Sequence, residues 1–142
     1  MKRMLGGDTL IPARFLTLLS HLCVVTTLLW ESQETVRYCL PSQYHDEYLL
    51  IYHSRLVAGF SAAITLVLLE LITFLSGLTM FHPTLAILSI GCHGSATVAL
   101  TYFVLGGWLC NWYWWIFTTC NVVPCAASLF VSITAIYYIR SR

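Results

Sequence analysis

Four long apolar stretches separated by shorter polar segments dominate the pattern of this chain. They predict helices at residues 12–30, 56–80, 84–104 and 113–139. A helix needs about 20 apolar residues to cross the hydrocarbon core of a bilayer, and each stretch has close to that length or more. The pattern therefore predicts an all-α membrane protein in which residues 1–142 form a single domain of four transmembrane helices.

The segments between these stretches predict how the helices are connected. Residues 81–83 leave room only for a tight turn, so the second and third helices should form a hairpin. Residues 31–55 form the one sizeable loop, which is polar and rich in tyrosine. The first stretch follows a basic start, as a signal peptide does, but no small-residue cleavage site follows Trp30. We therefore interpret it as an uncleaved helix.

The distribution of basic residues predicts the orientation. Four helices place both termini on one side of the membrane. The basic residues on that side are Lys2, Arg3, Arg14, Arg140 and Arg142, and those on the opposite side are Arg37 and Arg55. The positive-inside rule then predicts that both termini are cytosolic and that residues 31–55 form an extracytoplasmic loop.

Composition supports a membrane protein and excludes several other classes. Hydrophobic residues make up 58% of the chain and charged residues only 9%, whereas an ordinary soluble domain has about 25% charged residues. The net charge is +1 and no basic run of useful length occurs, so nothing indicates nucleic-acid binding. Membrane lipids are the first partner that this composition predicts.

Two ionisable residues in the hairpin are the main candidates for a site. Counted outward from the turn, Glu70 and His93 lie at nearly the same depth, roughly 15 Å from it at 1.5 Å per residue. His21 on the first helix lies at a comparable depth and could join them. Because a carboxylate inside the bilayer is costly, it should face the bundle interior and have a partner.

Two interpretations of this intramembrane cluster stay open. It could be a structural polar cluster that fixes helix register, or it could serve a small channel, transporter or proton relay. A metal site or a haem site would use the right ligand types, but no spacing motif indicates one. We therefore expect no metal and no cofactor.

Small residues and one proline predict how the helices pack. The small residues are Gly91, Ser95 and Ala99 on the third helix, and Gly59 and Ala63 on the second. Such lines allow helices to approach closely, either within this chain or against another membrane protein. Pro124 should kink the fourth helix, because it lacks an N–H and its ring clashes with the carbonyl of Cys120.

The six cysteines separate by their position relative to the predicted helices. Cys39 and Cys110 alone lie outside them, and the predicted topology places both on the oxidising face. We therefore predict a disulfide between Cys39 and Cys110. No nucleophile with a neighbouring base and no Gly-rich phosphate loop occurs, so we expect neither catalysis nor a small-molecule substrate.

Five stretches, in order along nearly the whole chain, resemble the transmembrane protein 107 family of the ciliary transition zone. They are residues 14–22 (RFLTLLSHL), 39–41 (CLP), 74–81 (FLSG with MF), 89–100 (SIGCHGSATVAL) and 108–117 (WxCxxYWxIF). Glu70 also lies where the family carries a glutamate.

The resemblance implies a non-enzymatic scaffold with cytosolic ends in the membrane at the base of the cilium. Its partners there would be other transition-zone membrane proteins and the tectonic and B9-domain proteins of the Meckel-syndrome complex. The scaffold would help to assemble and localise that complex. It would thereby support cilium formation, control of ciliary membrane protein content and hedgehog signalling. Outside residues 39–41 the long loop departs from the family.

Overall fold

The computed structural model describes residues 2–41, 43 and 45–142, with the backbone alone for residues 2–8 and 46. All regular secondary structure in these residues is helical. The elements are α1 (Lys2–Trp30), α2 (Ser32–Cys39), α3 (Asp46–Leu75), α4 (Pro83–Leu105), α5 (Trp112–Phe117), the π-helix η1 (Thr118–Val122) and α6 (Val123–Arg140). Four segments in this part of the chain are long and apolar enough to cross a membrane: Thr9–Trp30, Glu47–Leu75, Pro83–Leu105 and Trp112–Arg140.

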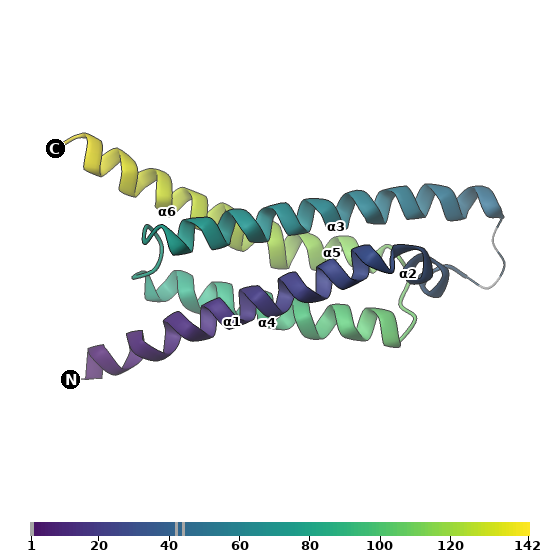
Figure 1. Ribbon diagram of the computed structural model, residues 1–142, viewed down its shortest axis with the longest axis horizontal. Helices are drawn as coiled ribbons and strands as arrows, with labels where there is room; N and C mark the ends of the chain where they lie inside the picture. The colour runs from purple at the N-terminus through teal and green to yellow at the C-terminus, as the bar shows by residue number, and fades with distance from the viewer. Residues whose placement is uncertain (1, 42, 44) are drawn as a thin grey trace.

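The four long helical segments run alternately up and down, so both termini lie at the same end of the molecule (Figure 1). We call this the terminal end, and the other the disulfide end. Helix α1 packs mainly on α4 and α3, while α6 packs on α3 and α4. Beyond residue 132, nearly all side chains of α6 are exposed, and its C-terminal turns diverge from the other helices (Figure 1).

The connection between α3 and α4 is longer than the predicted turn at residues 81–83. Helix α3 ends at Leu75, not at residue 80, and α4 begins at Pro83. Gly77 has a φ of +83°, a left-handed conformation that glycine adopts without strain, and this conformation ends the helical path. Pro83 is suited to the start of α4 because its missing N–H would have no partner there.

The predicted loop at residues 31–55 is largely helical. Helix α2 occupies Ser32–Cys39, and α3 begins at Asp46, ten residues before the predicted start at residue 56. In Figure 1 the first turns of α3 extend past α2 in line with the rest of that helix. Helix α1 likewise begins at Lys2, so Pro12 lies inside it and not at its first turn. For α1 and α3, the predicted start marked the beginning of the apolar part and not the beginning of the helix.

The last membrane-spanning segment changes its helical form next to Pro124. The π-helix Thr118–Val122 immediately precedes α6, and the N–H of Val123 donates to the carbonyl of Thr118. This wider winding accommodates a residue that cannot donate to Cys120 and whose ring would crowd its carbonyl. The segment therefore contains a π-helical turn at the place where the sequence predicts a kink.

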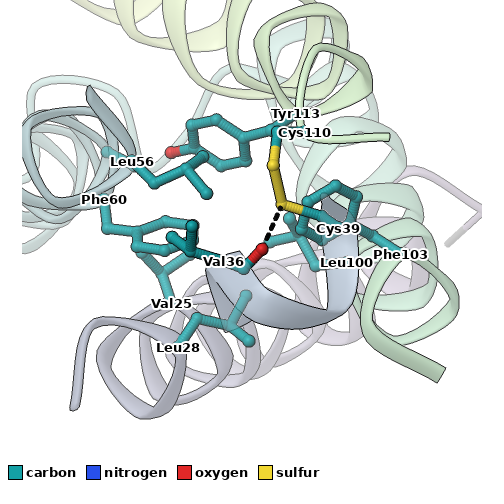
Figure 2. Packing of buried hydrophobic residues seen from close by; sticks show 11 residues of the cluster. Val25, Leu28, Val36, Cys39, Leu56, Phe60, Leu100, Phe103, Cys110 and Tyr113 are labelled. Carbon is teal, nitrogen blue, oxygen red and sulfur yellow. Dashed lines mark hydrogen bonds between the residues drawn. A yellow bond between two sulfur atoms is a disulfide. The ribbon is translucent and has the colours of Figure 1, made fainter. Parts of the chain in front are cut away.

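An apolar core lies at the disulfide end (Figure 2). It collects residues from α1 to α5: Val25, Leu28, Val36, Cys39, Leu56, Phe60, Ala63, Leu100, Phe103, Cys110 and Tyr113. Tyr113 packs edge-on against Phe60, with 4.8 Å between ring centroids. The core thus holds the helices together at one end of the bundle, while polar side chains connect them nearer the terminal end.

Candidate functional site

Glu70 is the centre of a buried polar network. It lies on α3, its side chain is 1% exposed, and both carboxylate oxygens are occupied. Oε1 accepts hydrogen bonds from Ser89 Oγ at 2.6 Å and from Arg14 Nη2 at 3.0 Å. Oε2 lies 2.9 Å from His93 Nε2. The hairpin thus brings together the two residues that the sequence places at equal depth.

Arg14 is the partner that the sequence analysis missed. The charge pattern predicts a cytosolic Arg14, whereas its side chain is 0% exposed and forms a salt bridge with Glu70. Arg14 Nη1 donates to the carbonyl of Thr79 at 3.1 Å, and Nη2 donates to Ser128 Oγ at 3.3 Å. The guanidinium also lies 5.2 Å from the centroid of the Phe74 ring. One side chain therefore connects α1, α3, the α3–α4 turn and α6.

A signal for Arg14 was present in the sequence. A lone carboxylate in an apolar bundle is costly unless a cation compensates it. Arg14 follows Pro12 within the same apolar stretch and so is a candidate for that cation. With Arg14 removed from the count, four basic residues remain on the side of the termini and two on the other, so the positive-inside rule still predicts cytosolic termini.

The two histidines extend the network from α3 to α1. His21 Nδ1 lies 2.7 Å from His93 Nδ1, and both rings are essentially unexposed. Ionised Glu70 can only accept hydrogen bonds, so His93 Nε2 carries the hydrogen between them. For neutral imidazoles this leaves His93 Nδ1 as the acceptor and His21 Nδ1 as the donor. His21 Nε2 is then a bare acceptor, and within the described residues it has no partner.

This arrangement favours a structural role over a reactive one. The charges of Arg14 and Glu70 cancel, and Ser89 and His93 make the other hydrogen bonds to the carboxylate. All of these side chains are at most 1% exposed, so the network is closed to water. Among the residues described, no group of three or more His, Cys, Asp and Glu side chains is placed to hold a metal ion.

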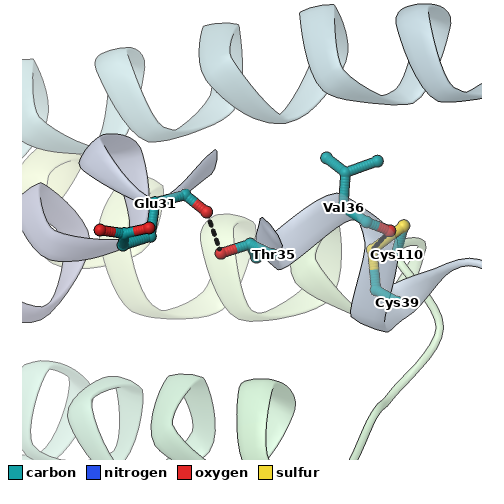
Figure 3. Close-up of a disulfide and its surroundings, with 5 residues drawn as sticks. All are labelled: Glu31, Thr35, Val36, Cys39 and Cys110. Carbon is teal, nitrogen blue, oxygen red and sulfur yellow. Dashed lines mark hydrogen bonds between the residues drawn. A yellow bond between two sulfur atoms is a disulfide. The ribbon is translucent and has the colours of Figure 1, made fainter. Parts of the chain in front are cut away.

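A disulfide joins Cys39 at the end of α2 to Cys110 in the α4–α5 connection (Figure 3). Their Cα atoms are 5.0 Å apart, and the N–H of Cys110 also donates to the carbonyl of Cys39. Helix α2 itself starts close to the end of α1, where Thr35 Oγ1 donates to the carbonyl of Glu31 (Figure 3). The cross-link therefore holds α2 over the apolar core.

The predicted packing residues divide into two groups. Gly59 is buried, and a Cβ at this position would lie 2.6 Å from Tyr113 Cε1; Ala63 is also completely buried. Gly91 is exposed, and a Cβ there would meet nothing within 4 Å. Ser95 is also exposed, and Ala99 is partly buried. The line on α3 thus serves packing within the chain, whereas most of the line on α4 faces outward.

Comparisons with known proteins agree with this architecture. Residues 10–132 match the sequence family TMEM107, described as a transmembrane protein. Transmembrane protein 107 of Homo sapiens is 42% identical over 125 residues, which cover 88% of this chain and 89% of the human protein. The chain belongs to the transmembrane protein 107 family.

Other members of the transmembrane protein 107 family have a similar level of sequence identity to this chain. The Mus musculus protein is 43% identical over 126 residues, covering 87% of this chain and 90% of the mouse protein. The Xenopus laevis protein is 37% identical over 126 residues, covering 89% of this chain and 90% of the frog protein. No solved structure is significantly similar to the chain. The matched region of the family includes Arg14, Glu70 and His93, and therefore the whole buried network.

Proposed function

We propose that this protein is a non-enzymatic transmembrane scaffold of the ciliary transition zone. Membership of the transmembrane protein 107 family carries the proposal. In this role the protein helps to assemble and localise the Meckel-syndrome complex, with tectonic and B9-domain proteins as partners. It thereby supports cilium formation and the control of ciliary membrane protein content.

The geometry of the bundle supports a docking body over a reaction site. The polar side chains of the network bind one another and are closed to water, so they hold the helices in register. In contrast, large apolar side chains are exposed along the membrane-spanning helices, among them Ile72, Ile87, Tyr102, Phe130 and Ile133. These surfaces are available to lipid and to the helices of other membrane proteins.

The disulfide supports an orientation with cytosolic termini. Disulfides form in the oxidising lumen of the secretory pathway and are rare in the cytosol. The disulfide joins the end of α2 to the α4–α5 connection, and these elements lie at the end of the molecule opposite to both termini (Figure 1). We therefore place the disulfide end on the extracytoplasmic side.

The decisive experiment is depletion and rescue in ciliated cells. A tagged copy should form a band at the ciliary base, and depletion should reduce tectonic and B9-domain proteins there. Wild-type protein should restore them, and so should His82→Gln, a change at an exposed position in the α3–α4 turn. A diffuse endomembrane pattern, or unchanged partners after depletion, would contradict the proposal.

A proton relay is the second candidate, and one observation favours it. His21, His93, Glu70 and Arg14 form a continuous chain of hydrogen-bonded ionisable groups. Conduction would require both ends of this chain to reach water. Proton flux into liposomes that depends on Glu70 would favour this candidate, and equal flux with Glu70→Gln would exclude it.

A further inference from the structure

The contact between His21 and His93 has room for only one hydrogen. Their Nδ1 atoms are 2.7 Å apart, which is the length of a short hydrogen bond. A hydrogen lies about 1 Å from its nitrogen, so two N–H groups directed at each other across this distance would overlap. The contact therefore exists only while at least one of the two Nδ1 atoms is bare.

The charges around the pair do not compensate a proton on each of the two imidazoles. Arg14 on α1 and Glu70 on α3 cancel each other. Outside the network, the titratable side chains of the described residues that interact with Glu70 are the thiols Cys92 on α4 and Cys125 on α6. One added proton converts the contact into a charged N–H···N bond. A second added proton places two like charges next to each other inside the bundle. It also occupies the one Nδ1 atom of the pair that could still accept a hydrogen bond.

The bare nitrogen of His21 adds a second reason for this contact to open. His21 Nε2 is buried without a partner within the described residues, and an unsatisfied buried acceptor is unfavourable. Opening of the α1–α4 contact to water would give both ring nitrogens of His21 a hydrogen-bond partner. The closed contact thus depends on the single bond to His93.

We propose that the His21–His93 contact is a proton-sensitive latch between α1 and α4. The latch is closed when the pair shares one hydrogen, and it opens when both imidazoles are protonated. On opening, α1 loses its polar link to α4, while Arg14 still binds Glu70. This inference concerns the bundle alone and does not depend on a location at the cilium.

The test compares thermal unfolding of the purified full-length protein in detergent at pH 7.5 and pH 5.0. Wild type should lose roughly 5 °C in Tm at the lower pH, a shift that is readily resolved for a protein of this size. His21→Phe keeps an aromatic ring but cannot take up a proton, so its shift should be less than half as large. His82→Gln, which changes an exposed histidine, should keep the wild-type shift. An equal shift in wild type and His21→Phe would overturn the proposal.

A spectroscopic measurement on the wild-type protein covers the case in which His21→Phe does not fold. Nitrogen NMR of ¹⁵N-histidine-labelled protein distinguishes bare from protonated ring nitrogens. At pH 7.5 the expected result is one protonated and one bare Nδ1 within the pair, with a bare His21 Nε2. Two fully protonated imidazoles in a still intact α1–α4 contact at pH 5.0 would overturn the latch.

Discussion

At the residue scale, the central feature is the ion pair of Arg14 and Glu70, in which both side chains are buried. Arg14 and Glu70 are at most 1% exposed, and Arg14 Nη2 lies 3.0 Å from Glu70 Oε1. Burial of an ion pair contributes little net stability, because desolvation offsets much of the attraction. Removal of one partner is different, since it leaves an uncompensated charge inside the bundle. The pair therefore favours one arrangement of helices over others.

This pair leads to a prediction for single and double variants. Arg14→Met and Glu70→Leu should each lower the free energy of unfolding by about 3–5 kcal/mol. The double variant should recover most of that loss, because two apolar side chains of similar size replace two charges. Thermal unfolding of all four proteins in the same detergent gives the coupling energy. Strictly additive losses would show that the two residues do not act as a pair.

Two glycines provide a matched test of packing. A Cβ at Gly59 would meet the buried ring of Tyr113 at 2.6 Å, so Gly59→Ala should cost about 1–3 kcal/mol of stability. A Cβ at Gly91 would meet nothing, so Gly91→Ala should leave the isolated protein unchanged or stabilise it by up to about 1 kcal/mol. Equal effects of the two changes in detergent would contradict the packing seen here.

At the element scale, helix α2 is the element that the sequence analysis did not recognise. It has eight residues, too few to be stable alone in water. Its buried face, Ser32, Thr35, Val36 and Cys39, rests on the apolar core, and the disulfide holds its end. Hydropathy alone could not detect α2, because its helical form depends on packing against the core and on the disulfide.

We predict that loss of the disulfide releases α2. The bond closes a sequence separation of 71 residues, and Cys39→Ser should lower stability by about 2–5 kcal/mol. Cys110→Ser should have the same effect, and the double variant should be no worse than either change alone. The matched control Cys23→Ser changes an exposed free cysteine and should behave as wild type. Tm measured with and without reductant should differ only in proteins that retain both Cys39 and Cys110.

Both boundaries of α4 were predicted well, whereas both boundaries of α3 were not. Helix α4 begins at Pro83 and ends at Leu105, each within one residue of the prediction. Helix α3 has 30 residues, roughly 45 Å at 1.5 Å per residue, and so exceeds a hydrocarbon core of about 30 Å. Its first turns carry tyrosines and charges that hydropathy interprets as a loop. An apolar pattern reports the part of a helix that lies in lipid, not the whole helix.

At the scale of the whole molecule, the four spans form two differently stabilised ends. The disulfide end has an apolar core closed by a covalent bond, whereas helices nearer the terminal end are linked by the Arg14–Glu70 network. The diverging ends of α1 and α6 in Figure 1 agree with this difference. The two ends of the bundle thus depend on different kinds of interaction.

The orientation gives a prediction for the intact protein in cells. Glu47→Cys, near the start of α3, should react with a membrane-impermeant maleimide on intact cells. Ser141→Cys, next to the C-terminus, should react only after permeabilisation. Both positions are exposed, and the parent for these variants is Cys23→Ser, so that the exposed free thiol does not contribute. Labelling of Ser141→Cys on intact cells would contradict the predicted cytosolic position of the termini.

The sequence by itself determined the membrane class, the number of spans and the depth of Glu70 and His93. These properties depend on local hydropathy and on a regular helical rise, which need no knowledge of neighbours. It also predicted that Cys39 and Cys110 lie on the same side of the membrane, and the structure joins them in a disulfide. Only the tertiary structure decided that Arg14 turns inward, that Gly91 faces outward and that α2 is a helix. Each of these depends on how helices rotate about their own axes, and that rotation is set by the contacts among all of them at once.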